Sequence, residues 1–543
     1  MINRRTYLYS VAALVILFGG ASSCTKNFKS INTPLIGSPI ASVPQLYVAF
    51  VSNMTLGDQQ VGNNSWVYPI TQLASVYTKA DYSYGNDGDE YWSNFYHNLP
   101  NYEAMMQQIA QQPDTASYTN VKCMMKVLKG YMAIKLSNFF GDMPYSAAGQ
   151  SLYYSPSNDT VLTPAYDKQQ SIYVSVLNDL QWAVNNFISG SAEGSQYPLG
   201  KADYVLLDSI PQWIEFANSL RLRIALSMYS KDPTDATPQI TDALSKPLLD
   251  ADNTNVGLYP TSNIPNMDLS ARMYSFGTEC RLRMGTTMWN LMSSDTAEDG
   301  SGIFDPRCNI FFEPNNNNQW NPFPQNPTSS TPAEEGSPYD EAIRNTDWAN
   351  KDGNPPTPNL YANLNYYWAV DYNIPELFMT AAEVHFLKAE IYAAGLAGVA
   401  ANMTTAQTEY NNGITASVNF WTQQAINSQI WVVNNPTVLP SQATINAMLT
   451  NPIVQFNPST ALQQIYAQEW IDMFRQPWDA WTLMRRTGGM TPMDPNNAGF
   501  YTATYGSFNR YQYPSSEQTY NKANWLAETG NNDVTTTKIW IAQ

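Results

Sequence analysis

The sequence predicts an all-α fold that is interrupted by one long loop-rich insertion. Apolar residues recur at helical spacing in several long segments with capping residues at their ends. No train of alternating, strand-like segments lies between them. The composition agrees, because 43% of the 543 residues are hydrophobic, enough for one large core or two smaller ones.

The net charge of −17 excludes one class of partner. A surface of this charge repels phosphate backbones, so we expect no nonspecific binding of nucleic acid. Aromatic residues make up 13% of the chain, as much as all charged residues together. This proportion is unusual for a cytosolic enzyme.

The chain begins with the pattern of an exported lipoprotein. Two arginines precede an apolar run from Tyr7 to Phe18, which is too short for a permanent membrane anchor but fits a cleaved signal. Small residues then lead to Cys24, as in a lipobox whose cysteine becomes acylated. We predict a signal peptide over residues 1–23 and a lipid on Cys24. An ordinary secretory signal with a nearby cysteine is the alternative.

The mature chain is predicted to start with a tether that leads to one domain. Residues 24–44 form the lipidated N-terminus and an extended segment, because three prolines punctuate small polar residues there. Residues 45–543 are then a single helical domain. No later stretch holds 18 unbroken apolar residues, so beyond the N-terminal lipid we expect no segment that spans a membrane.

Helices are expected in order along this domain. The first is stopped by Gly141 and Pro144, in the usual order for a helix end. The third begins with Pro211 at its first turn, and the last contains Pro477, which should kink it. The expected helices cover residues 121–140, 169–187, 211–229, 375–394, 404–424 and 460–486. The third should bury Trp213, Ala217, Leu220 and Ile224.

The amino-acid composition changes near residues 230–375, where we expect the insertion. Pro, Asn, Gly and aromatic residues dominate this stretch, which predicts loops. Stretches of this length without regular structure are usually functional in compact proteins.

Several ordered motifs then point to one family. Residues 213–223 read WIEFANSLRLR, the most specific block. Residues 141–146 read GDMPYS, and shorter blocks follow at 170–173, 305–307, 381–390 and 468–488. Together these motifs, spread between Phe28 and Gly488, resemble the SusD/RagB family of nutrient-binding outer-membrane lipoproteins, specifically its second, SusD-like branch.

The resemblance implies a helical fold with tetratricopeptide-like helix pairs. It also implies a lipid-anchored, surface-exposed outer-membrane protein that binds an oligosaccharide and delivers it to a TonB-dependent SusC-like transporter, without catalysis. Three alternatives stay open: capture of a peptide or other nutrient, a surface glycoside hydrolase, which needs only two carboxylates, and a structural subunit without a ligand.

Aromatic residues in turn-rich segments are the candidate ligand contacts. Sugar rings present apolar C–H faces that stack on aromatic planes. For any single ring we favour a role in packing loops onto helices, because most large aromatic side chains are buried, so the cluster is better evidence than its members. The ligand-binding candidates are Trp66, Tyr82, Tyr274, Trp289 and Trp320.

Metal and nucleophilic chemistry have little support in the sequence. With only His97 and His385, a His-rich metal site cannot be built, and no GxSxG motif is present. We therefore expect no catalytic residue and no cofactor.

Calcium is the one metal left open. The acidic cluster Asp81, Asp87, Asp89 and Glu90 offers oxygen ligands for Ca²⁺. It lacks EF-hand spacing, however, and we favour the interpretation as a solvated acidic loop. A second, weaker acidic cluster precedes Gly300.

The cysteines allow at most one disulfide. Cys123, Cys280 and Cys308 remain after the lipidated residue, and the spacing from Cys280 to Cys308 would permit a bridge.

Overall fold

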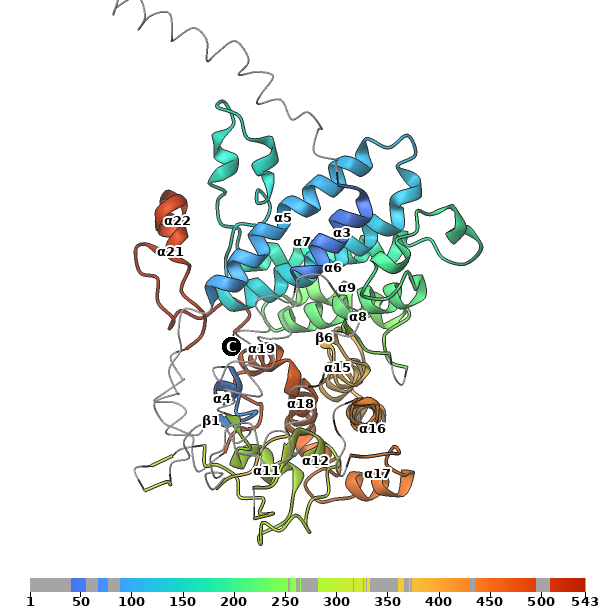
Figure 1. Cartoon of the computed structure of the whole chain (residues 1–543), viewed down its shortest axis with the longest axis vertical. Coiled ribbons are helices and arrows are strands. Elements are labelled where there is room, and N and C mark those ends of the chain that lie inside the picture. The colour runs from blue at the N-terminus through green and yellow to red at the C-terminus, as the bar shows by residue number, and fades with distance from the viewer. Residues whose placement is uncertain are drawn as a thin grey trace, which may run out of the picture. The chain divides into compact units, whose positions relative to one another are not determined.

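Helix packs on helix through most of the computed structural model (Figure 1). Residues 46–543 form one compact unit and residues 1–45 another. The structure describes residues 41–54, 67–76, 88–251, 254–259, 264, 282–315, 317–325, 327–328, 330–332, 360–365, 371, 374–429, 431, 435–494 and 508–542.

The helices follow one another in the following order. They are α3 (Val43–Ser52), α4 (Val67–Thr71), α5 (Gly88–Ala110), α6 (Thr119–Phe140), α7 (Gln169–Asn186), α8 (Ile210–Met228), α9 (Pro233–Leu244), α11 (Thr286–Met292), α12 (Cys308–Phe311), α15 (Ala381–Ala394), α16 (Met403–Asn427), α17 (Gln442–Leu449), α18 (Ala461–Asp472), α19 (Pro477–Arg486), α21 (Ser515–Tyr520) and α22 (Lys522–Thr529).

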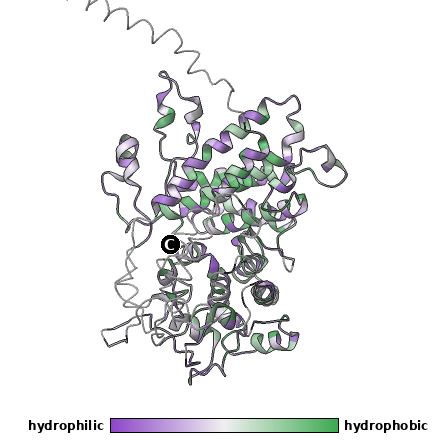
Figure 2. Cartoon of the chain, in the orientation of Figure 1, coloured by the Kyte–Doolittle hydropathy of each residue, from purple (hydrophilic) through white to green (hydrophobic). Residues whose placement is uncertain are grey.

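Neighbouring helices pair, which confirms the helical, tetratricopeptide-like class. Helix α6 packs on α7, α7 on α8 and α8 on α9, while α15 packs on both α16 and α18. Figure 2 shows hydrophobic and hydrophilic residues mixed along α5, whose buried residues recur every three or four positions and so lie on one face. Trp213, Trp421, Trp470 and Trp481 are among the largest fully buried side chains.

The strands are short and antiparallel. Strands β1 (Ser75–Val76), β3 (Leu282–Arg283), β5 (Asn363–Leu364) and β4 (Phe312–Glu313) form one sheet in that order. Strand β2 (Val256–Leu258) pairs with β6 (Glu376–Met379), and the register shifts after Val256. A Cβ atom at Gly257 would lie 2.5 Å from the Glu376 carbonyl oxygen, so only glycine allows this close approach.

Four expected helices are confirmed almost to the residue. The 121–140, 169–187, 211–229 and 404–424 segments correspond to α6, α7, α8 and α16. The predicted stripe on α8 is buried as expected, with Trp213 and Ala217 fully inaccessible. Gly141 and Gly488 adopt positive φ after α6 and α19, at 85° and 64°.

Two expected helices were wrong in part. The 375–394 segment begins as strand β6, and the helix starts only at Ala381, because Thr380 Oγ1 accepts a hydrogen bond from Glu383 N at 3.1 Å and caps it. The 460–486 segment is broken rather than kinked. A 3₁₀ turn at Met473–Arg475 separates α18 from α19, and Pro477 starts α19, where its missing N–H costs nothing.

The insertion is less irregular than expected. Helices α9, α11 and α12 and several strands fall within residues 230–375. Helix α5 was also missed, because Gly88 at its start, Pro100 inside it and its many polar residues obscured the helical pattern. Burial of Trp92, Phe95 and Leu99 stabilises this helix instead.

Candidate functional site

The candidate ligand aromatics fall into two groups. Trp66, Tyr82 and Tyr274 lie outside the described residues. Trp289 on α11 and Trp320 stack on each other, with ring centroids 6.0 Å apart and an interplanar angle of 13°. Their side chains are only 5% and 7% exposed, so the structure uses each ring first to cover the other.

An acidic loop packs against this pair. Gly300, at φ 82°, lies so close to the Trp320 indole that a Cβ would come within 2.7 Å of its Nε1. Asp295 Oδ1 accepts from Glu298 N at 3.0 Å and its Oδ2 from Gly300 N at 2.7 Å. These carboxylate oxygens stabilise their own turn, which explains the weaker of the two acidic clusters without a metal.

The principal acidic cluster is only partly described. Asp89 and Glu90 lie in the first turn of α5, where negative charge favours the helix dipole, while Asp81 and Asp87 are outside the described residues. Within the described ranges, no group of three or more His, Cys, Asp or Glu side chains is arranged to hold a metal ion. The calcium site stays a prediction.

The histidines and cysteines named in the sequence analysis are explained by contacts within the fold. His385 is buried in α15, with its Nδ1 2.6 Å from Glu409 Oε2, and His97 Nδ1 lies 3.0 Å from Ser93 Oγ. Cys123 and Cys308 are buried free thiols, which argues against the bridge from Cys308 to Cys280; Cys280 is outside the described residues.

A pocket of about 290 Å³ lies beside α11, and Trp289 does not line it. Asn290 and Leu291 contribute one wall from α11, and Gln463 and Ala467 another wall from α18. The segment after α19 completes the pocket with Met490, Pro492, Met493 and Asp494. An apolar wall with a few polar groups is the usual composition of a small-molecule site.

Two amides in this pocket are available to a ligand. Asn290 and Gln463 are exposed, and their side chains make no hydrogen bond to any part of the chain that the structure describes. Each amide offers both donor and acceptor groups. Leu291, Ala467 and Met490 lie beside them and provide apolar contact.

Gln72 fixes the rim of the pocket. Its Oε1 accepts a hydrogen bond from Thr287 Oγ1 at 2.5 Å and from Asp494 N at 2.9 Å. Thr286 Oγ1 donates to Asp494 Oδ2 at 2.6 Å. Gln72 itself is buried and adopts φ 59°, a conformation that residues other than glycine rarely take. Three segments that are distant in sequence are thereby joined.

Helix α4 holds α18 in place. Trp470 Nε1 donates to the Thr71 carbonyl oxygen at 2.8 Å, and Tyr68 Oη donates to the Phe474 carbonyl oxygen at 2.8 Å. Trp470 is fully buried, so this side chain serves the stability of the fold. The α18 wall of the pocket is therefore rigidly connected to the core.

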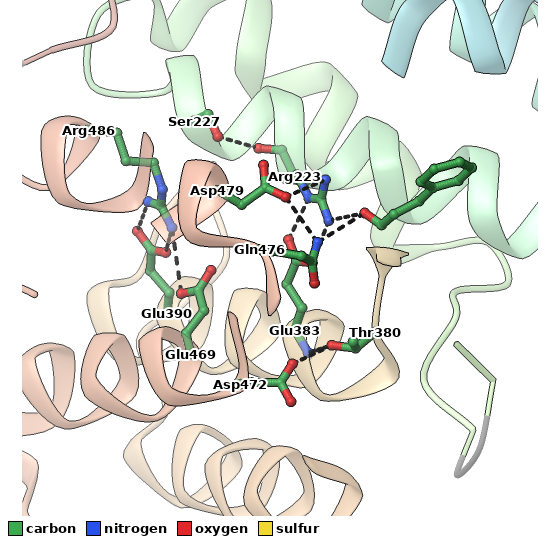
Figure 3. Close-up of polar contacts among 11 residues, drawn as sticks. Arg223, Ser227, Thr380, Glu383, Glu390, Glu469, Asp472, Gln476, Asp479 and Arg486 are labelled. Atoms are coloured by element: carbon green, nitrogen blue, oxygen red, sulfur yellow. Dashed lines mark hydrogen bonds and ion pairs between the residues drawn. The ribbon is translucent and has the colours of Figure 1, made fainter. Parts of the chain in front are cut away.

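Figure 3 shows a buried ionic network that includes residues of α18 and α19. Arg223 from α8 pairs with Glu383 at 2.5 Å through both its Nε and Nη2, and its Nη2 also donates to the Phe378 carbonyl oxygen at 2.7 Å. Arg486 from α19 pairs with Glu390 from α15. The cavity beside these side chains measures only about 30 Å³, too small for a sugar ring.

Burial changes the protonation of this network. It raises the pKa of Glu383 to about 7 even though the Arg223 guanidinium beside it favours the carboxylate. Burial also raises the pKa of Glu469 well above its usual range, since Arg486 Nη2 approaches no closer than 3.8 Å. The network orients α15, α18 and α19, and with them the walls of the pocket.

Sequence reasoning missed Asn290, Gln463 and Asp494. Their signal was weak, because the three residues come from segments that are far apart in the sequence and only the fold joins them. The Met-Thr-Pro-Met run after Gly488-Gly489 was the one local hint of an apolar surface.

The chain is similar in sequence to one known family. The SusD-like_2 family model, described as starch-binding and associating with the outer membrane, matches residues 41–514. No curated protein matches the chain.

Solved structures share the fold. A chitin-binding protein is 20% identical with a TM-score of 0.67, over 92% of this chain and 100% of that one. A SusD homologue from Parabacteroides distasonis is 18% identical with a TM-score of 0.66, over 92% and 98% of the two chains. A chitin-binding SusD homologue from Flavobacterium johnsoniae is 19% identical with a TM-score of 0.62, with the same two coverages.

Proposed function

The chain belongs to the SusD-like family of starch-binding proteins that associate with the outer membrane, and from this premise we propose that it captures an oligosaccharide at the cell surface and delivers it to a SusC-like TonB-dependent transporter. Proteins of this family bind ligands and are not enzymes, in agreement with the expectation from sequence.

The α11–α18 pocket is the observation that carries this proposal. Its volume of about 290 Å³ is just below the range of about 300 to 1,000 Å³ that small-molecule sites occupy. Free amides of Asn290 and Gln463 would bond sugar hydroxyls, while Leu291, Ala467 and Met490 would contact the apolar ring face. Trp66, Tyr82 and Tyr274 remain proposed contacts on segments outside the described residues.

The related structures narrow the choice of saccharide to test. Two of them are named as chitin-binding, and the family description names starch. A β-linked N-acetylglucosamine oligomer and an α-linked glucose oligomer are therefore the first probes, chitohexaose and maltoheptaose.

Isothermal titration of the mature chain tests the ligand class. We expect heat from at least one of the two oligosaccharides and none from a mixture of short peptides. Binding of the peptides alone would contradict the proposal and favour the peptide alternative. Turnover of either oligosaccharide would contradict the assignment as a binding protein.

Delivery requires a partner transporter. If this chain covers the transporter like a lid, the two proteins need a broad contact surface, above about 1,000 Å² for a stable complex. Purification from gently solubilised outer membranes should recover a large β-barrel together with this chain. Repeated recovery of the lipoprotein alone, with the transporter expressed, would contradict the proposed delivery step.

A further inference from the structure

A second pocket lies where the C-terminal segment packs on the end of α6. Its volume is about 370 Å³, within the range of about 300 to 1,000 Å³ that ligand sites occupy. Its walls come from the end of α6, residues 510 and 513, the end of α22 and residues 537–540. None of these residues lines the α11–α18 pocket.

The inner wall of this second pocket is preformed. The rings of Phe140 and Tyr513 stack 6.0 Å apart with an interplanar angle of 13°, and both are buried. The Arg510 guanidinium lies 4.6 Å from the Tyr513 ring centroid and pairs with Asp533. Asp533 Oδ2 also accepts from Tyr513 N at 2.9 Å, so these groups hold one another in place.

The outer wall is a partly exposed tryptophan on a fixed segment. Tyr173 contacts the Trp540 ring edge to face, with centroids 5.9 Å apart. On one side of Trp540, Asn509 N donates to the Thr535 carbonyl oxygen at 2.8 Å. On the other, Ile541 N donates to Gln169 Oε1 at 3.2 Å. The ring is thus held rigidly at the pocket, as a stacking platform must be.

The charged side chains that line the second pocket are already paired with other groups of the chain. Lys168 Nζ lies 2.7 Å from Asp142 Oδ2 and 2.9 Å from Glu528 Oε2. Arg510 is paired with Asp533, and Lys538 also has an interaction partner. An ionic ligand would have to break these pairs, so the pocket favours an uncharged ligand.

The polar side-chain groups of this pocket that have no partner are uncharged. Among the described residues, the Trp540 indole N–H, the Asn532 amide and the Thr537 hydroxyl have no hydrogen-bond partner. An uncharged ligand that offers many hydroxyl groups and one apolar face fits this set. We infer that this pocket is a second saccharide-binding site, with Trp540 as its stacking platform and Asn532 and Thr537 as hydrogen-bonding groups. It shares only the ligand class with the proposed function.

Titration of the mature chain with maltoheptaose and chitohexaose tests this site. We use an Ala467→Phe background, in which a bulky ring fills the α11–α18 pocket, so that the remaining heat reports the second pocket. In that background Trp540→Ala should weaken the remaining binding about tenfold or more, and Asn532→Ala several-fold. Trp182→Ala is the matched control, because Trp182 is exposed on α7 and does not line the pocket.

The outcomes separate the two proposals. If Ala467→Phe removes all binding, or if Trp540→Ala and Asn532→Ala bind like the background, the second site is wrong while the proposed function stands. If the wild-type chain binds neither oligosaccharide, both fail. Asn532 is exposed, so its variant should fold normally and keeps the test decisive even if Trp540→Ala is destabilised.

Discussion

Arg486 and Glu390 form a two-point ion pair inside the protein, with Nη1 3.0 Å from Oε1 and Nη2 2.9 Å from Oε2. Tyr466 Oη also donates to Glu390 Oε1, at 2.8 Å. Arg486 lies in the last turn of α19, where a cation also favours the helix dipole. The pair adds a tertiary role, because it fastens α19 to α15.

Breaking this pair should destabilise the fold. We predict that Arg486→Ala lowers the free energy of unfolding by about 3 to 5 kcal/mol, because Glu390 is left buried without its partner. Denaturant unfolding checks this value. Lys201→Ala, at an exposed lysine, should change it by less than about 0.5 kcal/mol. An Arg486→Ala variant as stable as the control would contradict the role given to the network.

The buried carboxyl groups of the network predict that the stability of the fold depends on pH. A carboxyl whose pKa is raised in the folded state stabilises the fold below its unfolded value of about 4.5, and that stability is lost as the pH rises through the folded value. Glu469 and Glu383 are both of this kind, and for Glu383 the stability is lost between its unfolded pKa of about 4.5 and its folded pKa of about 7.

Glu469→Gln should therefore flatten this dependence. Glutamine keeps the shape of the neutral acid, so we expect melting temperatures equal to wild type at pH 4 and higher than wild type at pH 8. Asp159→Asn, at an exposed position, is the control and should follow wild type at both values. A variant less stable than wild type at pH 8 would show that Glu469 is needed as a carboxylate.

The stacked tryptophans give a third prediction. Because Trp289 and Trp320 cover each other, Trp320→Ala should cost about 3 to 5 kcal/mol of stability, as expected for a buried tryptophan. Thermal unfolding beside Trp182→Ala measures this cost. If Trp320→Ala instead weakens oligosaccharide binding about tenfold with unchanged stability, the ring serves the ligand, as the sequence first suggested.

The lipid anchor predicted at Cys24 gives a fourth test. Cys24→Ala should release the protein from the membrane fraction into a soluble one, because the apolar signal is too short to retain it. Among the described residues, no helix is long and apolar enough to cross a bilayer. Retention of the variant in membranes of palmitate-labelled cells would contradict lipidation at this residue.

The helices could be predicted where local signals were complete. Helix α8 has a proline at its first turn and a buried stripe that includes Trp213, so its period and its start agree. Strand β6 could not be predicted, because its pairing with Val256–Leu258 bridges about 120 positions and leaves no period in its four residues. Thr380 was the available signal for the true start of α15.

The pocket could not be predicted for a related reason. Asn290, Gln463 and Met490 become neighbours only through the contacts of Gln72, Thr71 and Trp470 described above. An unpartnered amide is a property of the folded chain, which composition does not reveal. Aromatic residues were the visible feature, and the two described candidates proved to be buried against each other.

Binding of oligosaccharide in the α11–α18 pocket is the central claim, and titration of pocket variants tests it most directly. With whichever of chitohexaose and maltoheptaose the wild type binds, Asn290→Ala and Gln463→Ala should each weaken the tighter binding event about two- to tenfold, the value of a lost hydrogen bond. Ala467→Phe should remove that event. Gln407→Ala, at an exposed glutamine on α16, should leave it unchanged. Wild-type affinity in all three pocket variants would contradict the claim.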